Sequence, residues 1–368
     1  MNFKFCSPVK IKFGENSLEV LDAIKGRNVM IFASNSAIKG GSIERVREHL
    51  FTNRISVYSD IEPNPTCDNI DAALISAKGN KAEIIIALGG GSVMDTAKCV
   101  SVLMTNGGMI EDYMTGKVLE RQGLPMYLIP TTSGTGSEVT NVAVVTDKRR
   151  GVKRPIVSPY MLPEYALIVP SFTLSVPKVV TADTGWDAFD HAIESYWNKE
   201  SNPISDAIAK NAIKLILDNI EKAYDNGADL EARTNMALGS LMAGVAFAET
   251  RTTALHGLSF HMTSNYNLSH GRACTLTLLP FLTEITKASK DKMTALAKTI
   301  GCYSIDEFIA SVRAKLIHTG MPITLSAAGI PEEAIEELAD EGLKNKIMFL
   351  TPLEINREKV IRILKTIK

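Results

Sequence analysis

The stretch AEIIIALGGGSVMDTAKCVSVLM, residues 82–104, decides the fold class of the N-terminal half of the chain. Its apolar first part predicts a buried strand, and a helix is expected to open at Ser92 to Asp95. The turn between strand and helix consists of Gly89, Gly90 and Gly91. Because glycine has no Cβ and a helix N-terminus carries positive partial charge, a phosphate can approach bare backbone here. The stretch therefore predicts a nucleotide site, although such a turn can be purely structural and the pattern is not GxGxxG.

Short β-rich runs alternate with amphipathic helical stretches on both sides of this turn, up to about Pro170. The β-rich runs are Asn28 to Ser34, Ile55 to Tyr58, Glu83 to Leu88, Met126 to Ile129 and Ala166 to Val169. The helical stretches between them include Ser42 to Phe51 and Asn69 to Lys78. Alternation of this kind is typical of parallel βαβ units. We therefore expect an α/β dinucleotide-binding domain over residues 1–177.

Long helical patterns replace the β-rich runs after Pro177. They cover Ala182 to Asn198, Ile204 to Tyr224, Leu230 to Glu249, Ser304 to Thr319, Pro331 to Leu343 and Asn356 to Ile367. A chain of 368 residues also exceeds the size at which one hydrophobic core keeps growing. A second, all-α domain is expected over residues 178–368, with the junction near the sequence SFTLSVPKVV.

A second polar turn follows another predicted strand, in LIPTTSGTGSEVTNVAVVTD. It concentrates hydroxyl side chains and glycines between Thr131 and Ser137. Such a turn suits hydrogen bonds to the ribose and pyrophosphate of a nucleotide. The alternative is a polar turn without a ligand.

The composition favours small-molecule partners. The formal net charge of −1 argues against electrostatic binding to nucleic acid or to an anionic membrane. Five widely spaced cysteines without a CxxC pair fit reduced thiols better than a disulfide framework. The sequence contains no apolar run long enough to span a membrane. A soluble, cytoplasmic protein is expected.

Four side chains can hold one divalent metal ion in this histidine-poor chain: Asp187, His191, His256 and His270. Asp187 and His191 are four residues apart in a helical stretch, so both leave the same helix face. His256 and His270 flank the turn-rich sequence SNYNLS, which allows both imidazoles to return to one point. Three imidazoles and a carboxylate suit Zn²⁺ or Fe²⁺. The alternative is a set of scattered polar core residues, since no short metal motif such as HExxH is present.

Five motifs in this order resemble the iron-containing (group III) alcohol dehydrogenase family: PNPT, GGGSVMDTAK, PTTSGTGSEVT, DAFDHAIESY and the His256 to His270 segment. The resemblance covers nearly the whole chain. It implies a dehydroquinate synthase-like fold, with the active site in the cleft between an α/β domain and a helical domain. It also implies a homodimer or larger homo-oligomer, and a metal bound by the four side chains just named, with Fe²⁺ the commonest ion.

The resemblance further implies a nicotinamide nucleotide, NAD or NADP, as the second cofactor. By the family pattern, its neighbours are Asn64, Gly91, Ser92, Asp95, Thr131, Thr132, Thr135, Lys153 and Leu174, and the glycine turn adds Gly90. Relatives that prefer NAD often carry an aspartate after the second strand, where this chain has Ser34. With no carboxylate to repel a 2′-phosphate, NADPH is expected to bind.

Two further departures concern the substrate. Many relatives carry a histidine close to the nicotinamide where this chain has Phe260, so the group that would transfer the proton is not assigned. The next residue, His261, lies about 100° further round a helix and is interpreted as structural. The residues Arg251, Thr252 and Thr253 precede His256 and can form an anion-binding cluster. With Phe260, this variant resembles a subgroup that reduces phosphonoacetaldehyde. A surface arginine is the alternative, and Arg154 and Arg272 are weaker candidates for the same role.

The sequence as a whole predicts a metal-dependent, NAD(P)(H)-linked alcohol dehydrogenase or aldehyde reductase. Its substrate is expected to be a small primary alcohol or aldehyde, with a phosphonate or carboxylate tail as the finer hypothesis. Two alternatives stay open at this point. One is a lyase of the dehydroquinate synthase type that uses NAD only transiently, and the other is a non-catalytic metal- or nucleotide-binding protein.

Overall fold

A computed structural model describes residues 2–368, which divide into two compact units. The first unit comprises Ser7–Thr132 and Gly136–Val176. The second comprises Pro177–Lys368 together with Ser133–Thr135 and the N-terminal residues up to Cys6. The junction at Val176 and Pro177 falls inside the SFTLSVPKVV segment, while two short segments from the N-terminal half belong to the second unit.

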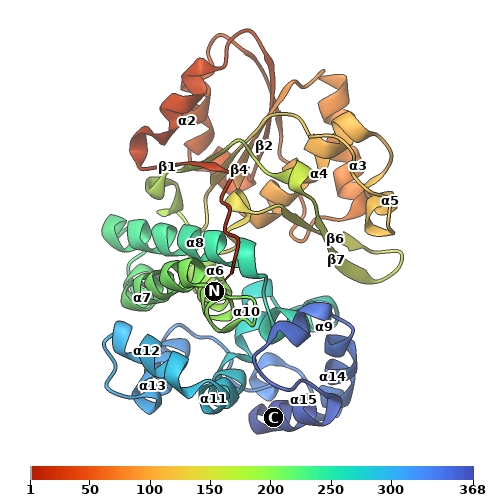
Figure 1. The fold of residues 1–368 in the computed structure, drawn as a ribbon. Helices are drawn as coiled ribbons and strands as arrows, with labels where there is room; N and C mark the ends of the chain where they lie inside the picture. Colours follow the sequence, from red (N-terminus) through yellow and green to blue (C-terminus); the bar gives the residue numbers. More distant parts are fainter. Residues whose placement is uncertain (1) are drawn as a thin grey trace. The chain divides into compact units, whose positions relative to one another are not determined.

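A six-stranded parallel sheet forms the centre of the first unit, in the order β1-β8-β5-β4-β2-β3 (Figure 1). The strands are β1 (Lys10–Phe13), β2 (Asn28–Ala33), β3 (Arg54–Tyr58), β4 (Ile84–Gly89), β5 (Met126–Pro130) and β8 (Tyr165–Ile168). An antiparallel hairpin of β6 (Val142–Asp147) and β7 (Val152–Val157) accompanies it. The helices of this unit are α1 (Asn35–Lys39), α2 (Ser42–Glu48), α3 (Cys67–Gly79), α4 (Gly91–Asn106) and α5 (Ile110–Met114).

The central strand β4 is buried along its whole length because helices cover both faces of the sheet. Ile85 and Ala87 point to one face and pack with residues of α3 and α4. Ile84, Ile86 and Leu88 point to the other face, where α2 packs. The apolar run of β4 is thus the sequence signature of a strand inside a doubly covered parallel sheet.

The order in which successive strands are added to the sheet reverses between β2 and β4. From β2 the chain continues to β3 on one side, and it then crosses to β4 on the other side. In open α/β sheets, ligands bind beyond the carboxyl ends of the strands at such a switch point. The segments that follow β2 and β4 at this point are the Ser34 turn and the Gly89 to Gly91 turn. They lie next to each other, since the Ser34 N–H donates to the Leu88 carbonyl at 3.0 Å.

Helices alone make up the regular structure of the second unit. The long ones are α6 (Lys178–Trp197), α7 (Pro203–Asp225), α8 (Leu230–Thr250) and α13 (Ile305–His318). The shorter ones are α9 (Ala254–Asn265), α10 (His270–Thr275), α11 (Leu278–Ala288), α12 (Lys290–Thr299), α14 (Ile335–Leu343) and α15 (Arg357–Leu364). Short 3₁₀ turns occur in both units. The expected α/β unit and helical unit are both confirmed.

Helix α6 is the core of this unit, since every residue from Gly185 to Trp197 is buried. Helix α10 packs closely on it at Gly271, where a Cβ atom would collide with the Asp183 carbonyl oxygen. Only glycine fits this contact. The close approach brings His270, the first residue of α10, beside the Asp187 turn of α6.

Three strands were not predicted from the sequence. Strand β1 has the alternating sequence KIKF, which is only four residues long and exposed at every position, and it is held by pairing with β8. Strand β6 lies in the stretch that was expected to follow a polar turn, and no element was expected at β7. None of the five cysteines forms a disulfide, and the part of the chain that the structure describes contains no helix suited by length and hydropathy to span a bilayer.

Candidate active site

Asp187 and His191 leave the same face of α6, one turn apart. Oδ2 of Asp187 lies 3.9 Å from Nδ1 of His191, and both side chains are almost completely buried. The imidazole of His191 stacks on Phe247 of α8 with ring centroids 4.2 Å apart. Packing between α6 and α8 therefore fixes the orientation of His191.

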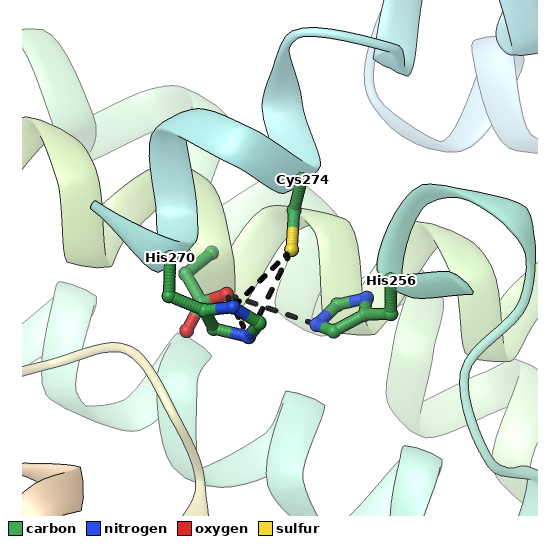
Figure 2. A group of neighbouring side chains, drawn as sticks. His256, His270 and Cys274 are labelled. Carbon is green, nitrogen blue, oxygen red and sulfur yellow. Dashed lines mark hydrogen bonds and ion pairs between the residues drawn. The ribbon is translucent and has the colours of Figure 1, made fainter. Parts of the chain in front are cut away.

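His256 of α9 and His270 of α10 converge on the same carboxylate. Oδ1 of Asp187 lies 3.8 Å from Nε2 of His256 and 3.8 Å from Nε2 of His270. The His256 and His270 rings are 5.3 Å apart, and the His191 and His256 rings 4.4 Å apart. Figure 2 shows the His256 and His270 side chains directed toward a common point from two separate helices. The four residues proposed from spacing are thus brought together by three helices.

The buried polar atoms of this cluster fit a divalent cation. Within residues 2–368, Nε2 of His256 and Nδ1 of His191 are buried and make no hydrogen bond. A buried polar atom without a partner costs roughly 1–3 kcal/mol. A metal ion bound to these nitrogens and to the Asp187 carboxylate removes this cost, and neutral imidazole nitrogens are common metal ligands.

A residue absent from the sequence prediction also belongs to this cluster. Among the described residues, the donor atoms of Asp187, His256, His270 and Cys274 all lie within 4.8 Å of one another. Cys274 lies one turn after His270 on α10, and this spacing of four residues is a weak sequence signal that ordinary buried helix positions share. His191 is not a member of this tightest group, although it contacts Asp187.

A second missed residue, Glu194, orients His256. Oε1 of Glu194 accepts hydrogen bonds from the Thr253 hydroxyl at 2.6 Å, the Thr253 N–H at 3.0 Å and the Leu255 N–H at 2.8 Å. Oε2 contacts Nδ1 of His256. Because a carboxylate only accepts, Nδ1 carries the proton and Nε2 is left with its lone pair facing Asp187. Glu194 follows Asp187 by seven residues, two helical turns on the same face.

The electrostatics of the cluster follow from its burial. Burial lowers the pKa of His191 well below its usual range, and the neighbouring His256 adds to this effect. Burial alone would also lower the pKa of His256, but Cys274 and Glu194 together raise it well above its usual range. Burial raises the pKa of the Cys274 thiol to about 11. Burial and the neighbouring side chains thus shift the pKa values of the clustered groups in different directions.

Arg251 lies at the end of α8 with a φ of 69° and a ψ of 176°. This conformation is nearly exclusive to glycine and costs on the order of 1–3 kcal/mol for another residue. Asn198 holds it in place by donating to the Arg251 carbonyl at 3.1 Å. The guanidinium is partly buried, and burial lowers its pKa. No salt bridge or side-chain hydrogen bond of this guanidinium is found among residues 2–368, and the nearby Glu249 carboxylate attracts it electrostatically.

The other candidate substrate residues differ in environment. The Thr253 hydroxyl is fully buried, donates to Glu194 and accepts from Nε1 of Trp197 at 2.9 Å, so its hydrogen-bonding partners lie within the protein. Thr252 and Phe260 are partly exposed. His261 contacts Glu337 and Asn265, which agrees with a structural histidine. Arg272 pairs with Asp183 at 2.7 Å, and Arg154 is exposed on β7.

The glycine turn after β4 leaves the backbone uncovered at the start of the 16-residue helix α4. A Cβ atom at Gly89 would lie 2.5 Å from Cγ2 of Val93, and one at Gly90 would lie 3.2 Å from Oγ1 of Thr132. The contact at Gly89 leaves no room for a side chain, and the contact at Gly90 leaves little, so this turn favours glycine at both positions. The turn therefore has the features of a phosphate site, and Gly91 and Ser92 form the first turn of the helix.

Several predicted nucleotide residues gather around this turn. The Asn64 N–H donates to Oγ of Ser92 at 3.1 Å, and Nζ of Lys153 donates to Oδ1 of Asn64 at 2.8 Å. Asn64 itself adopts a φ of 54°, in the left-handed region that asparagine tolerates. Ser34 caps α1 by accepting from the Ala37 N–H at 3.2 Å.

Asp95 anchors the second polar turn to α4. Its Oδ1 accepts from the Ser137 hydroxyl at 2.8 Å, and its Oδ2 accepts from the Val144 N–H at 3.0 Å. The completely buried Lys98 donates to the Ser137 hydroxyl at 2.8 Å and to the Val142 carbonyl at 2.8 Å. Burial lowers the pKa of Lys98 to about 8. These bonds attach the segment from Ser137 to Val144, which follows Thr131 and Thr132 in the chain, to α4.

Two predicted nucleotide residues lie elsewhere. Thr135 belongs to the Ser133–Thr135 segment, which is part of the helical unit. In this segment a Cβ at Gly134 would lie 2.7 Å from Cβ of Thr184 on α6, so the segment packs closely on that helix. Leu174 is partly buried at the end of a 3₁₀ turn, Pro170–Thr173.

Comparisons with known proteins agree with this architecture. Residues 8–170 match the family model described as iron-containing alcohol dehydrogenase. Residues 181–368 match the model for the C-terminal part of the Fe-containing alcohol dehydrogenase family. The chain therefore belongs to the iron-containing alcohol dehydrogenase family.

Individual relatives are similar over most of their length. Long-chain-alcohol dehydrogenase 1 of Geobacillus thermodenitrificans is 34% identical over 343 residues, which cover 89% of this chain and 86% of the relative. Sulfoacetaldehyde reductase of Bilophila wadsworthia is 32% identical, with 93% and 92% covered. The crystal structure of sulfoacetaldehyde reductase from Bifidobacterium kashiwanohense in complex with NAD⁺ has a TM-score of 0.94 and 31% identity, with 100% and 99% covered.

Proposed function

We propose that the protein is a metal-dependent, NAD(P)(H)-linked alcohol dehydrogenase or aldehyde reductase for a small primary alcohol or aldehyde with an anionic tail. The observation that carries this proposal is the convergence of Asp187, His256 and His270, with donor atoms 3.8 Å apart on three helices. Membership of the alcohol dehydrogenase family supports the reaction class.

Asp187, His191, His256 and His270 would hold the metal ion, with Fe²⁺ as the first choice and Zn²⁺ as the second. When bound, the cation polarises the aldehyde carbonyl, and the reduced nicotinamide supplies hydride to the same carbon. Glu194 keeps Nδ1 of His256 protonated, so that Nε2 offers its lone pair. Stacking on Phe247 restricts rotation of the His191 ring.

The nucleotide would bind along the carboxyl ends of β2, β4 and β5. Gly90, Gly91 and Ser92 at the start of α4 would contact its phosphates. Asn64, Lys153, Thr131 and Thr132 would supply hydrogen bonds to the ribose and pyrophosphate, and Asp95 braces the turn that carries the threonines. Thr135 and Leu174 remain candidate contacts. At the end of β2, Ser34 presents no carboxylate, which permits the 2′-phosphate of NADPH.

Arg251 supports an anionic substrate. Its partly buried guanidinium has no salt bridge within the described residues, and a planar fork of donors suits a carboxylate, phosphonate or sulfonate group. Two of the relatives are named for reduction of sulfoacetaldehyde, an aldehyde with a sulfonate tail. Thr252 would add a hydroxyl to the same anion, and Phe260 would line the pocket.

A panel of aldehydes tests the proposal. Apoprotein is loaded with Fe²⁺ or Zn²⁺, and oxidation of NADH and of NADPH is followed with phosphonoacetaldehyde, sulfoacetaldehyde, a carboxylated aldehyde and butanal. The proposal predicts steady oxidation with many turnovers per protein and fastest turnover on the acidic aldehydes. A lyase that uses NAD transiently, or a non-catalytic binder, would show no steady net oxidation.

A further inference from the structure

One side chain of the metal cluster has no role in the function proposed so far. Cys274 lies one turn after His270 on α10 and is completely buried. Its Sγ lies 3.8 Å from Nε2 and 3.9 Å from Nδ1 of His270. Figure 2 shows the Cys274 side chain directed toward the same point as the His256 and His270 side chains. None of the other four cysteines joins a group of metal-binding atoms in residues 2–368.

A second observation points to a ligand at this position. The His256 side chain is only 6% exposed, and its Nε2 makes no hydrogen bond with any described residue. The Glu194 contact at Nδ1 leaves the lone pair of Nε2 directed into the group that contains Cys274. The group thus pairs a thiol with an unsatisfied, buried nitrogen donor.

The separations are a little longer than those of ligand atoms on one ion. Bond lengths of about 2.0–2.1 Å to oxygen or nitrogen and about 2.3 Å to sulfur place neighbouring ligand atoms roughly 3.3–3.6 Å apart at tetrahedral angles. The Asp187 Oδ1 to His256 Nε2, Asp187 Oδ1 to His270 Nε2, and His270 Nε2 to Cys274 Sγ distances are each 3.8 Å. All four donor atoms lie within 4.8 Å of one another, close enough for side-chain movements to bring them onto one ion.

We propose that Cys274 is a further metal ligand beside Asp187, His191, His256 and His270, so that the site takes a thiophilic divalent cation such as Zn²⁺ or Co²⁺. The inference rests on the metal centre of the proposed function. On binding, the thiol gives its proton to solvent and its sulfur lone pair to the cation, with no change in oxidation state. A thiolate favours Zn²⁺ over the hard cations Mg²⁺ and Mn²⁺.

Spectroscopy of the Co²⁺-substituted protein tests this assignment without relying on activity. Bound Co²⁺ gives visible ligand-field bands with nitrogen and oxygen ligands alone, whereas a near-ultraviolet charge-transfer band requires a thiolate ligand. The wild type is expected to show both features. Cys274→Ser should keep the visible bands and lose the charge-transfer band. Cys302→Ser, which changes a partly exposed cysteine of the same unit, is the matched control and should keep both.

Competition with a chelator gives a second measurement. Removal of a residue that supports a metal ligand lowers metal affinity roughly ten- to hundredfold. Cys274→Ser removes a ligand itself, so the Zn²⁺ affinity should fall by at least this factor. Cys274→Ala tests the same loss if the serine variant unfolds. Visible bands without a charge-transfer band in the wild type would overturn the Cys274 assignment and leave the dehydrogenase proposal intact. A protein that binds no Co²⁺ would overturn both.

Discussion

The Glu194 carboxylate contacts Nδ1 of His256 and leaves Nε2 of the same ring facing Oδ1 of Asp187, 3.8 Å away. Three further hydrogen bonds from Thr253 and Leu255 fix the carboxylate itself. Outer contacts of this kind set both the tautomer and the orientation of a metal-binding histidine. The tautomer and orientation of His256 therefore depend on Glu194, which is not itself one of the proposed metal ligands.

Glu194→Gln tests this dependence. Glutamine keeps an oxygen for the Thr253 and Leu255 N–H groups but presents an NH₂ to His256, which moves the imidazole proton to Nε2 and blocks that lone pair. Metal affinity, measured by chelator competition, should fall roughly ten- to hundredfold. Glu200→Gln, at an exposed position just beyond α6, is the control. Wild-type affinity in Glu194→Gln would show that the contact does not set the tautomer.

His191→Ala and His270→Ala should each weaken metal retention and abolish turnover while nucleotide binding persists, because these residues belong to the helical unit and the glycine turn to the other. Metal analysis after dialysis and titration with NADH measure the two properties separately. His318→Ala, which changes an exposed histidine paired with Asp225, should leave both unchanged. A variant that keeps its full metal content and full rate would remove that histidine from the site.

The wild type should use NADPH at least as well as NADH, because Ser34 offers no charge to repel a 2′-phosphate. Ser34→Asp keeps a good helix N-cap but adds that charge, and should raise KM for NADPH about tenfold, equivalent to about 1.4 kcal/mol. Ser34→Asn, a neutral N-cap of similar shape, separates charge from size. Strong rejection of NADPH by the wild type would refute the role given to Ser34.

Arg251→Ala should lower kcat/KM for phosphonoacetaldehyde or a carboxylated aldehyde roughly ten- to hundredfold, since a charge-assisted hydrogen bond contributes about 1.5–3 kcal/mol. Butanal should be nearly unaffected and serves as the internal control. Alanine occupies the same positive φ with a similar backbone cost, so the change isolates the guanidinium. Equal losses on charged and neutral aldehydes would leave the anion site without support.

The sequence predicted those parts of the structure that depend on local pattern. The apolar run before Gly89 and the helix after it are found as β4 and α4. The spacing of Asp187 and His191 correctly placed them on one face of α6. Strand β1 was missed because its KIKF alternation is only four residues long, and its pairing with β8 involves residues more than 150 positions away.

Glu194 and Cys274 could not be assigned from the sequence because their roles arise from packing between helices. Glu194 meets His256 only because α9 begins beside α6, and Cys274 approaches the cluster because Gly271 lets α10 contact α6 closely. The spacings of seven residues from Asp187 and four from His270 were visible. Spacing alone does not distinguish them from ordinary buried positions on a helix.

Removal and restoration of the metal tests the central claim most directly. The protein is treated with a chelator, and oxidation of NADPH with an acidic aldehyde is measured before and after addition of Fe²⁺ or Zn²⁺. We expect no steady oxidation by the apoprotein and recovery in proportion to bound metal, up to one ion per chain. Steady oxidation that is unchanged in the metal-free protein, or no turnover with either metal, would contradict the assignment of a metal-dependent dehydrogenase.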